Sequence, residues 1–309
     1  MRVVESVREL QALADRERAA GLRIALVPSM GALHAGHLSL VAEGRRRADR
    51  VWVSIFVNPA QFNDPGDLAR YPRDFESDLE SCRGSGVDVV FAPSPEEMYP
   101  QDSQTWVDVS DLALPLCGRS RPGHFRGVTT IVSKLLLAAK PHVAVFGQKD
   151  FQQLAVIRRM ARDLGFDVEI AGGITAREAD GLALSSRNAN LDAEARRQAP
   201  VLSRALDAAS AAVAAGERDA PRLLGIVRRE IEKAPLARVD YAELRDPESL
   251  EPVAGPLEHA TLLALAVFLR SGADEVRLID NAVLRPSPEG AAARASFHPH
   301  PPVSEEDPP

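Results

Sequence analysis

Two histidines, His34 and His37, lie three residues apart in the segment VPSMGALHAGHLSL, residues 27–40. An apolar run precedes them and a helix-like stretch follows, and residues at i and i+3 of a helix share a face. The first N–H groups of a helix are unpaired and bind anions such as phosphate. A single histidine at this place would be more typical of a cap or a surface residue. The pair favours a phosphate site, and no acidic or thiol residue lies at the spacing of a metal site.

A second segment, FGQKDFQQ (residues 146–153), also follows an apolar run and begins a helix-like stretch. Lys149 is one of only four lysines in a chain whose other cations are arginines. A lysine offers a flexible point charge for a phosphate. The alternative is a solvated lysine at the start of a helix.

A third segment, READGLALSSRN (residues 177–188), joins the hydroxyls of Ser185 and Ser186 to the guanidinium of Arg187. Two hydroxyl donors beside a planar guanidinium could hold a polyphosphate leaving group, although a capped loop would show the same pattern.

Two polar insertions follow apolar runs, at residues 58–63 and 121–127, and the first contains Gln61. Its amide can donate and accept at once, which suits a small hydroxy acid.

The elements that must position these segments alternate between strands and helices. An open parallel sheet covered on both faces binds ligands at the carboxyl ends of its strands, so the sequence predicts an α/β fold. The expected strands are residues 24–27, 51–57, 87–91, 143–146 and 166–170, and the expected helices are 4–20, 36–48, 73–83, 126–139 and 150–163.

The pattern changes after residue 173. Two helices are expected over 192–215 and 219–233, followed by strands over 237–244, 261–269 and 275–279. We therefore predict a nucleotide-binding domain over residues 1–175 and a smaller α+β domain over 176–285. Residues 286–309 are rich in proline and lack apolar periodicity, which predicts a disordered tail.

Composition narrows the class of protein. The 309 residues include 37 Lys+Arg against 44 Asp+Glu, so the formal net charge is −7. This balance argues against a nucleic-acid-coating surface, which needs a basic excess. The longest apolar run, residues 262–269, is far short of the roughly 20 residues that cross a bilayer. Two cysteines and no signal sequence indicate a reduced, cytoplasmic globular protein, and we expect neither nucleic-acid nor membrane partners.

Together these segments resemble the pantoate–beta-alanine ligase family. The first is similar to its HxGH signature, with Ser29 in a threonine position, and residues 54–62 are similar to its SIFVNPxQF stretch. Residues 146–153 and 177–188 match two further stretches, the latter being the counterpart of the KMSKS loop of class I aminoacyl-tRNA synthetases. Leu184 replaces a usual methionine, and Ala176 a frequent valine. The resemblance covers residues 20–282.

The resemblance implies a Rossmann-like sheet of the HxGH nucleotidyltransferase type, a lid-like smaller domain and a homodimer. It implies that ATP, (R)-pantoate and beta-alanine give pantothenate, AMP and diphosphate through a pantoyl adenylate, with Mg²⁺ on the phosphates. The implied catalytic residues are His34, His37, Lys149, Ser185, Ser186 and Arg187, and none is a metal ligand. ATP would be bound by Met30, Gly31, Ala32, Leu33, His34, Ala35, Gly36, His37, Gly147, Gln148, Lys149, Asp150, Ala176, Leu184, Ser185, Ser186 and Arg187, and pantoate by Gln61 and Gln153.

Two questions stay open at this point. His37 is conventionally the proton donor, but a carboxylate that is already ionised needs no base, so phosphate stabilisation alone would explain it. Tyr71 and Arg121 are weaker site candidates. The rival functions are a nucleotidyltransferase that stops at a nucleotidylated product and a catalytically inactive nucleotide-binding protein.

Overall fold

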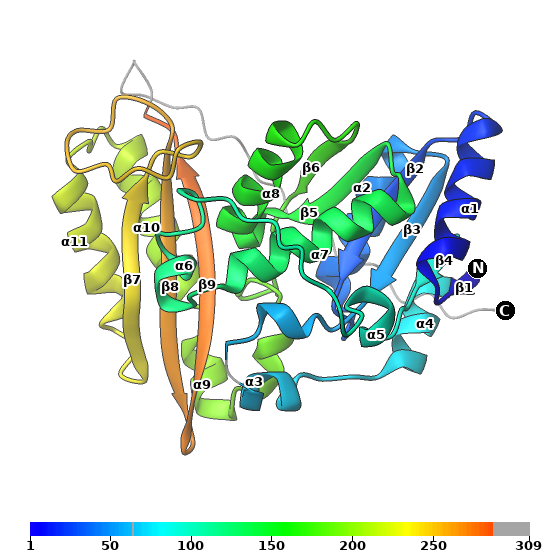
Figure 1. The fold of residues 1–309 in the computed structure, drawn as a ribbon. Coiled ribbons are helices and arrows are strands. Elements are labelled where there is room, and N and C mark those ends of the chain that lie inside the picture. The colour runs from blue at the N-terminus through cyan, green and yellow to red at the C-terminus, as the bar shows by residue number, and fades with distance from the viewer. Residues whose placement is uncertain (64, 287–309) are drawn as a thin grey trace, which may run out of the picture.

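The structure, a computed structural model, describes residues 1–63 and 65–286, and its largest element is a six-stranded parallel sheet (Figure 1). The strand order is β1-β4-β3-β2-β5-β6, and every neighbouring pair is parallel. The strands are β1 (Arg2–Val4), β2 (Ile24–Ser29), β3 (Arg50–Ile55), β4 (Val89–Phe91), β5 (Val143–Gly147) and β6 (Glu169–Gly173). The expected α/β class is confirmed.

Both faces of this sheet are covered, as the residues of β2 demonstrate. Ile24 and Leu26 belong to a core with α1 (Val7–Ala19), α7 (His124–Ala139) and α8 (Phe151–Asp163). Ala25 and Val27 belong to the core on the other face, with α2 (Ala35–Arg47) and α4 (Phe75–Gly84). Alternate residues of a strand point to opposite faces, so a strand buried on both reads as one continuous apolar run.

A smaller antiparallel sheet follows in the chain and lies to the left of the large sheet in Figure 1. Its strands, in the order β7-β8-β9, are β7 (Ala237–Arg245), β8 (Thr261–Ser271) and β9 (Asp274–Leu284). The helices α9 (Ala193–Gln198), α10 (Val201–Ala214) and α11 (Ala220–Ile231) share one core with it. The expected smaller α+β part is therefore present. The boundary at residue 175 falls between β6 and α9 and stays a prediction.

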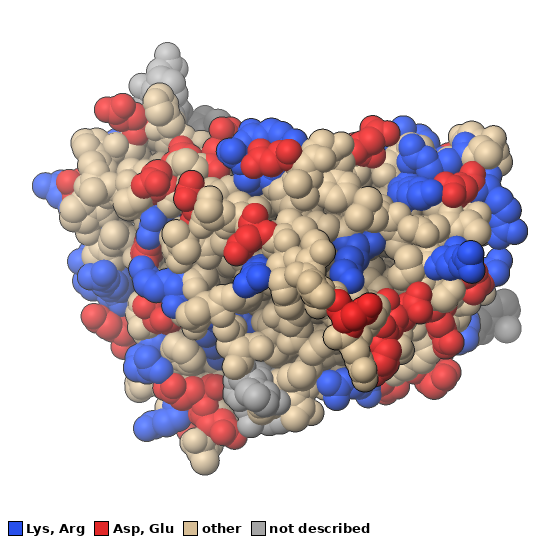
Figure 2. Space-filling view, viewed as in Figure 1, with Lys and Arg blue, Asp and Glu red and all other residues tan. Residues whose placement is uncertain are grey.

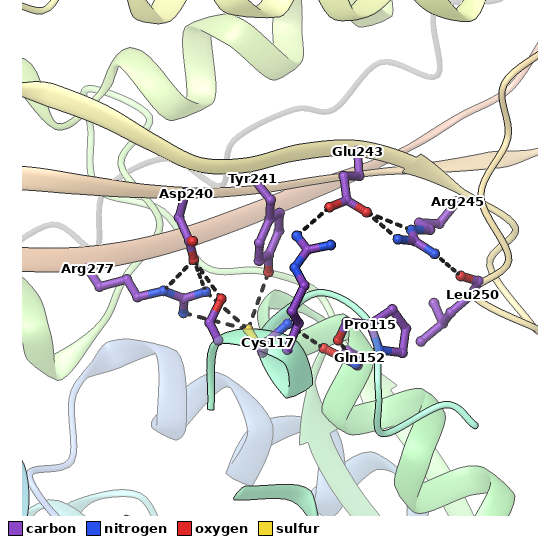
Figure 3. Close-up of polar contacts among 11 residues, drawn as sticks. Pro115, Cys117, Gln152, Asp240, Tyr241, Glu243, Arg245, Leu250 and Arg277 are labelled. Atoms are coloured by element: carbon purple, nitrogen blue, oxygen red, sulfur yellow. Dashed lines mark hydrogen bonds and ion pairs between the residues drawn. The ribbon is translucent and has the colours of Figure 1, made fainter. Parts of the chain in front are cut away.

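A mixed apolar and polar contact joins the two sheets through the short helix α6 (Cys117–Ser120) (Figure 3). Cys117 Sγ lies 3.3 Å from the Tyr241 hydroxyl, within an apolar cluster that also contains residues of α7, α8 and β8. The Arg277 guanidinium donates to Asp240 Oδ2 at 2.8 and 3.0 Å and lies 3.6 Å from the same sulfur. These contacts thus fix the smaller sheet against α6, a helix in the segment that connects β4 and β5 of the larger sheet.

Local backbone chemistry explains where the expected elements were wrong. The helix expected over 192–215 is two helices, α9 and α10, because Pro200 between them has no N–H to donate. The helix expected from residue 4 begins at Val7 with Ser6 as its N-cap, because residues 2–4 pair with β4. The short helices α3 (Pro65–Arg70), α5 (Pro95–Met98) and α6 have no periodicity that a sequence could reveal. The expected tail lies outside the described residues beyond residue 286.

Charges of both signs are interspersed on the face of the molecule in Figure 2, without a continuous basic field. This agrees with the mild net negative charge of the chain. Within residues 1–63 and 65–286, no helix has the length and apolarity that a bilayer span requires.

Candidate active site

The candidate site lies where the strand order of the large sheet reverses. From β2 the chain proceeds to β3 and β4 on one side, whereas β5 and β6 continue on the other side. The connections that leave the carboxyl ends of neighbouring β2 and β5 therefore diverge and open a crevice, the usual ligand site of such sheets. The first connection carries His34 and the second carries Lys149.

A cavity of about 240 Å³ occupies this crevice. The expected residues that line it are Met30, His34, Gly36, His37, Gln61, Gly147, Lys149, Asp150, Gln153, Ala176, Leu184, Ser185, Ser186 and Arg187. Gly31, Ala32, Leu33, Ala35 and Gln148 do not line it. A neighbouring cavity of about 630 Å³ extends from Lys149 and Arg187 to the smaller sheet. Three segments far apart in the sequence thus share one cavity.

The two histidines cap the helix α2 with their own rings. His34 is the N-cap residue, and its Nδ1 accepts the backbone N–H of Gly36 at 3.1 Å. His37 Nδ1 accepts the backbone N–H of His34 at 3.4 Å, and the two ring centroids are 4.2 Å apart. A Cβ at position 36 would lie 2.9 Å from the His34 ring, so only glycine leaves room for this cap. With Nδ1 accepting, each neutral ring carries its proton on Nε2.

Both rings are neutral near pH 7. Burial, with the neighbouring His34 ring and Lys149, lowers the pKa of His37 to about 3. Burial and then Lys149 also lower the pKa of His34. Each ring is therefore an Nε2–H donor on the wall of the cavity, not a cation.

The loop between β2 and α2 is held by a carboxylate from α4. Asp78 accepts the backbone N–H of Ala32 at 3.0 Å and that of Leu33 at 2.7 Å. Gly31 (φ +85°) and Ala32 (φ +51°) have the left-handed backbone that turns these N–H groups toward one acceptor. Together with the cap on Gly36, this corrects the expectation that the N–H groups of this segment are unpaired. The backbone of this segment therefore offers fewer free donors to an anion than expected.

Positive charge reaches the cavity from the other two segments. Lys149, whose side chain is 17% exposed, lies 3.3 Å from Asp150 Oδ2. Ser185 caps the short turn that contains Ser186 and Arg187, because its hydroxyl accepts the Arg187 N–H at 3.3 Å. The cavity thus carries an ammonium, a guanidinium and two hydroxyls beside the two imidazoles, a set of donors suited to a polyphosphate.

A buried amide network fixes Gln61 in the wall of the cavity. Asn58 donates to Gln61 Oε1 at 3.0 Å and accepts from the Tyr99 hydroxyl at 2.8 Å. His124 Nδ1 lies 2.8 Å from the Gln61 carbonyl oxygen, to which Arg121 also donates at 3.2 Å. Asn58 and His124 line the cavity but were not among the expected site residues, although both lie in the two polar insertions of the sequence.

Two adjacent glutamines have different environments. Gln153 lines both cavities. Gln152 is buried, and its amide donates to the carbonyl oxygens of Leu112 and Pro115 and accepts the N–H of Cys117. Gln152 therefore serves the fold, whereas Gln153 lies at the cavities, and its expected contact with pantoate stays a prediction. Tyr71 and Arg121, the weaker candidates, also line the cavities.

Acid is expected to destabilise the fold partly through His124. Burial, and then the Arg121 guanidinium, lower its pKa to about 3 from an ordinary 6.5. In the unfolded chain His124 takes up a proton near pH 6.5, whereas in the folded chain it stays neutral down to about pH 3. The free energy of unfolding therefore falls as the pH drops from 6.5 toward 3. Urea unfolding of a His124→Gln variant should lose about 2 kcal/mol less between pH 7 and pH 5 than the parent chain. Equal losses would contradict a neutral His124.

Comparison with known families shows which family the chain belongs to. A family model described as pantoate-beta-alanine ligase matches residues 2–283. The chain belongs to the pantoate-beta-alanine ligase family. It is therefore a ligase that joins pantoate to beta-alanine.

The similarity to known relatives extends over nearly the whole length of both chains. The pantothenate synthetase of Geobacter sulfurreducens is 54% identical over 284 residues, which are 92% of this chain and 99% of the relative. That of Myxococcus xanthus is 53% identical over 92% of this chain and 95% of its own.

Two solved structures extend the similarity to the fold. Pantothenate synthetase of Thermus thermophilus has a TM-score of 0.86 at 44% identity, over 93% of this chain and all of that one. The Francisella tularensis ligase, in complex with beta-gamma ATP and beta-alanine, has a TM-score of 0.74 at 31% identity, over 92% and 97% of the two chains.

Proposed function

We propose that this ligase makes pantothenate in two steps. A carboxylate oxygen of pantoate attacks the α-phosphorus of ATP, and the bond from that phosphorus to the bridging oxygen breaks, so that diphosphate leaves with the electron pair. The amine of beta-alanine then attacks the acyl carbon of the pantoyl adenylate, AMP leaves, and the amine proton passes to solvent. The Francisella relative solved with both an ATP compound and beta-alanine supports this pair of ligands.

One observation carries the proposal: the histidine pair, Lys149 and residues 185–187 line the same cavity as Gln61. The first three groups suit a polyphosphate, and the buried Gln61 suits the polar groups of pantoate. A transfer at phosphorus needs little covalent help from the protein, so positioning and charge neutralisation are its main tasks.

We assign the phosphate contacts to the Nε2–H groups of His34 and His37, to Lys149 and to residues 185–187. The low pKa of His37 supports hydrogen-bond donation over proton transfer, because a ring that is neutral near pH 7 is a poor acid. Gln61 and Gln153 are assigned to pantoate. Asp150 is assigned to the ribose, and the backbone of residue 176 to the adenine.

Mg²⁺ is proposed as part of the nucleotide substrate. The described residues contain no group of three His, Cys, Asp or Glu that could hold a metal ion. Mg²⁺ keeps several waters and commonly binds substrate phosphates, whose charge it would neutralise there. A homodimer, a cytoplasmic location and movement of the smaller part as a lid are also proposed, on the family membership alone.

Exchange of labelled diphosphate into ATP tests the function. Pantoate alone, without beta-alanine, is expected to drive the exchange, since the adenylate forms before the amine enters. Added beta-alanine should then release AMP and pantothenate in equal amounts. Exchange that needs beta-alanine would refute the two-step scheme, ADP as a product would refute transfer at the α-phosphorus, and no exchange would favour an inactive nucleotide-binding protein.

Replacing Gln61 with alanine is expected to weaken pantoate binding about tenfold or more, because a buried polar group of the substrate loses its partner, at about 1–3 kcal/mol. Direct titration should find ATP affinity within about twofold of the parent. Gln153→Ala is expected to behave in the same way. An ATP affinity that falls while pantoate affinity holds would reverse the assignment.

A further inference from the structure

Two neighbouring residues near the end of β9, Asp280 and Asn281, contact segments from other parts of the chain. Figure 1 shows β9 as the edge strand on the side of the large sheet. Asn281 Nδ2 donates to the carbonyl oxygens of Gln148 at 3.0 Å and of Lys149 at 2.8 Å. The smaller sheet thus holds the backbone of the residue whose ammonium lines the cavity.

Asp280 holds a second segment of the site. Its side chain is 1% exposed and accepts two hydrogen bonds from the Arg177 guanidinium, at 2.6 and 3.0 Å. The same guanidinium donates to the Gly181 carbonyl oxygen at 3.0 Å, and Arg177 pairs with Ala183 in a β-bridge. The Arg177 guanidinium therefore fixes the turn that leads directly to residues 185–187.

The two contacts are mechanically linked. Asp280 Oδ1 also accepts the backbone N–H of Asn281 at 2.8 Å, and both residues lie within the ladder between β8 and β9. A buried bidentate ion pair has a narrow geometry, and removing either partner leaves an uncompensated charge. One rigid dipeptide therefore joins the Lys149 connection to the loop of residues 177–188.

We propose that Asp280 and Asn281 are positioning residues that set the distance between Lys149 and the Ser185–Arg187 turn. This inference rests on the proposed function, in which both groups act on the phosphates of one ATP. Adenylate formation needs them in place together, so a small displacement of either loop slows this half-reaction. The attack of beta-alanine comes later and depends less on this spacing.

The test compares Asn281→Ala with Asn281→Asp in pantoate-dependent ATP–diphosphate exchange. Alanine removes both donors and is expected to slow exchange about tenfold and to lower the melting temperature by a few degrees, with the KM for beta-alanine unchanged. Aspartate keeps the shape, but its oxygens face two carbonyl oxygens, so this variant should be slower still. If Asn281 only filled space, aspartate would be faster than alanine.

Arg177→Lys provides a second variant should the first pair fail to fold. Lysine keeps the charge beside Asp280 but loses the planar fork, so exchange is again expected to fall about tenfold. Arg238→Gln is the matched control, because Arg238 forms an exposed ion pair with Glu275 on the same sheet. This control should retain full exchange.

Three outcomes overturn the inference, in two distinguishable ways. Parent-like exchange in folded Asn281→Ala, or an aspartate variant faster than the alanine variant, refutes the positioning role while the function stands. An absence of pantoate-dependent exchange in the parent chain refutes the proposed function and this inference with it. Slower exchange in the order parent, alanine, aspartate supports the positioning role.

Discussion

Replacing Lys149 with alanine is expected to slow pantoate-dependent ATP–diphosphate exchange by about 10²–10³. The ammonium lines both cavities, and its ion pair with Asp150 is a loose one at 3.3 Å. A preorganised donor aimed at charge that develops in the transition state typically contributes about 3–4 kcal/mol to its stabilisation. The fold should survive, because Asn281 contacts the backbone of residue 149, not its side chain.

Lys140→Ala is the matched control for this experiment. Lys140 is 38% exposed and pairs with Asp15 outside the cavities, so its removal should change exchange by less than about twofold. Near-normal exchange in a folded Lys149→Ala variant would mean that the phosphates lie elsewhere.

Replacing His34 with asparagine is expected to preserve the fold but slow the same exchange about 100-fold. Asparagine is a favoured N-cap residue, so its side-chain oxygen can accept the Gly36 N–H in place of Nδ1. The variant loses the Nε2–H donor, and the stabilisation of transition-state charge falls accordingly. Thermal unfolding and exchange measured on one preparation would separate the cap from the phosphate contact.

His142→Asn is the control for that substitution. His142 Nδ1 also accepts a backbone N–H, from Ile24 at 3.0 Å, but His142 does not line either cavity. Its exchange should stay at the parent level. A His34→Asn variant that is as active as this control would show that His34 serves only the helix.

Much of the fold could be predicted because apolar runs and periodicity record burial directly. Strand β2 is apolar from Ile24 to Val27 because both of its faces are buried there, and this run ends where the ligand-binding edge begins. Strand β1 could not be predicted, because three residues carry no period and depend on pairing with β4. The break before Val201 was predictable in principle from Pro200, which interrupts an otherwise helical pattern.

The candidate site was predictable where chemistry and local motif coincide, as at His34 and Lys149. It was not predictable where a residue acts through contacts distant in sequence. Asp78 is one carboxylate among many in the sequence, and only the fold brings it to the loop after β2. Asn281 likewise lies 132 residues from Lys149, and no local pattern marks its role.

The carboxylate of Asp78 has a consequence for how ATP binds. Its hydrogen bonds to the backbone N–H groups of Ala32 and Leu33 are made within the protein. Contacts within the protein are therefore sufficient to fix this loop, and we expect that ATP binding does not have to order it. Association at this segment should be a single kinetic phase whose rate rises linearly with ATP concentration, without the plateau that a slow loop rearrangement would impose.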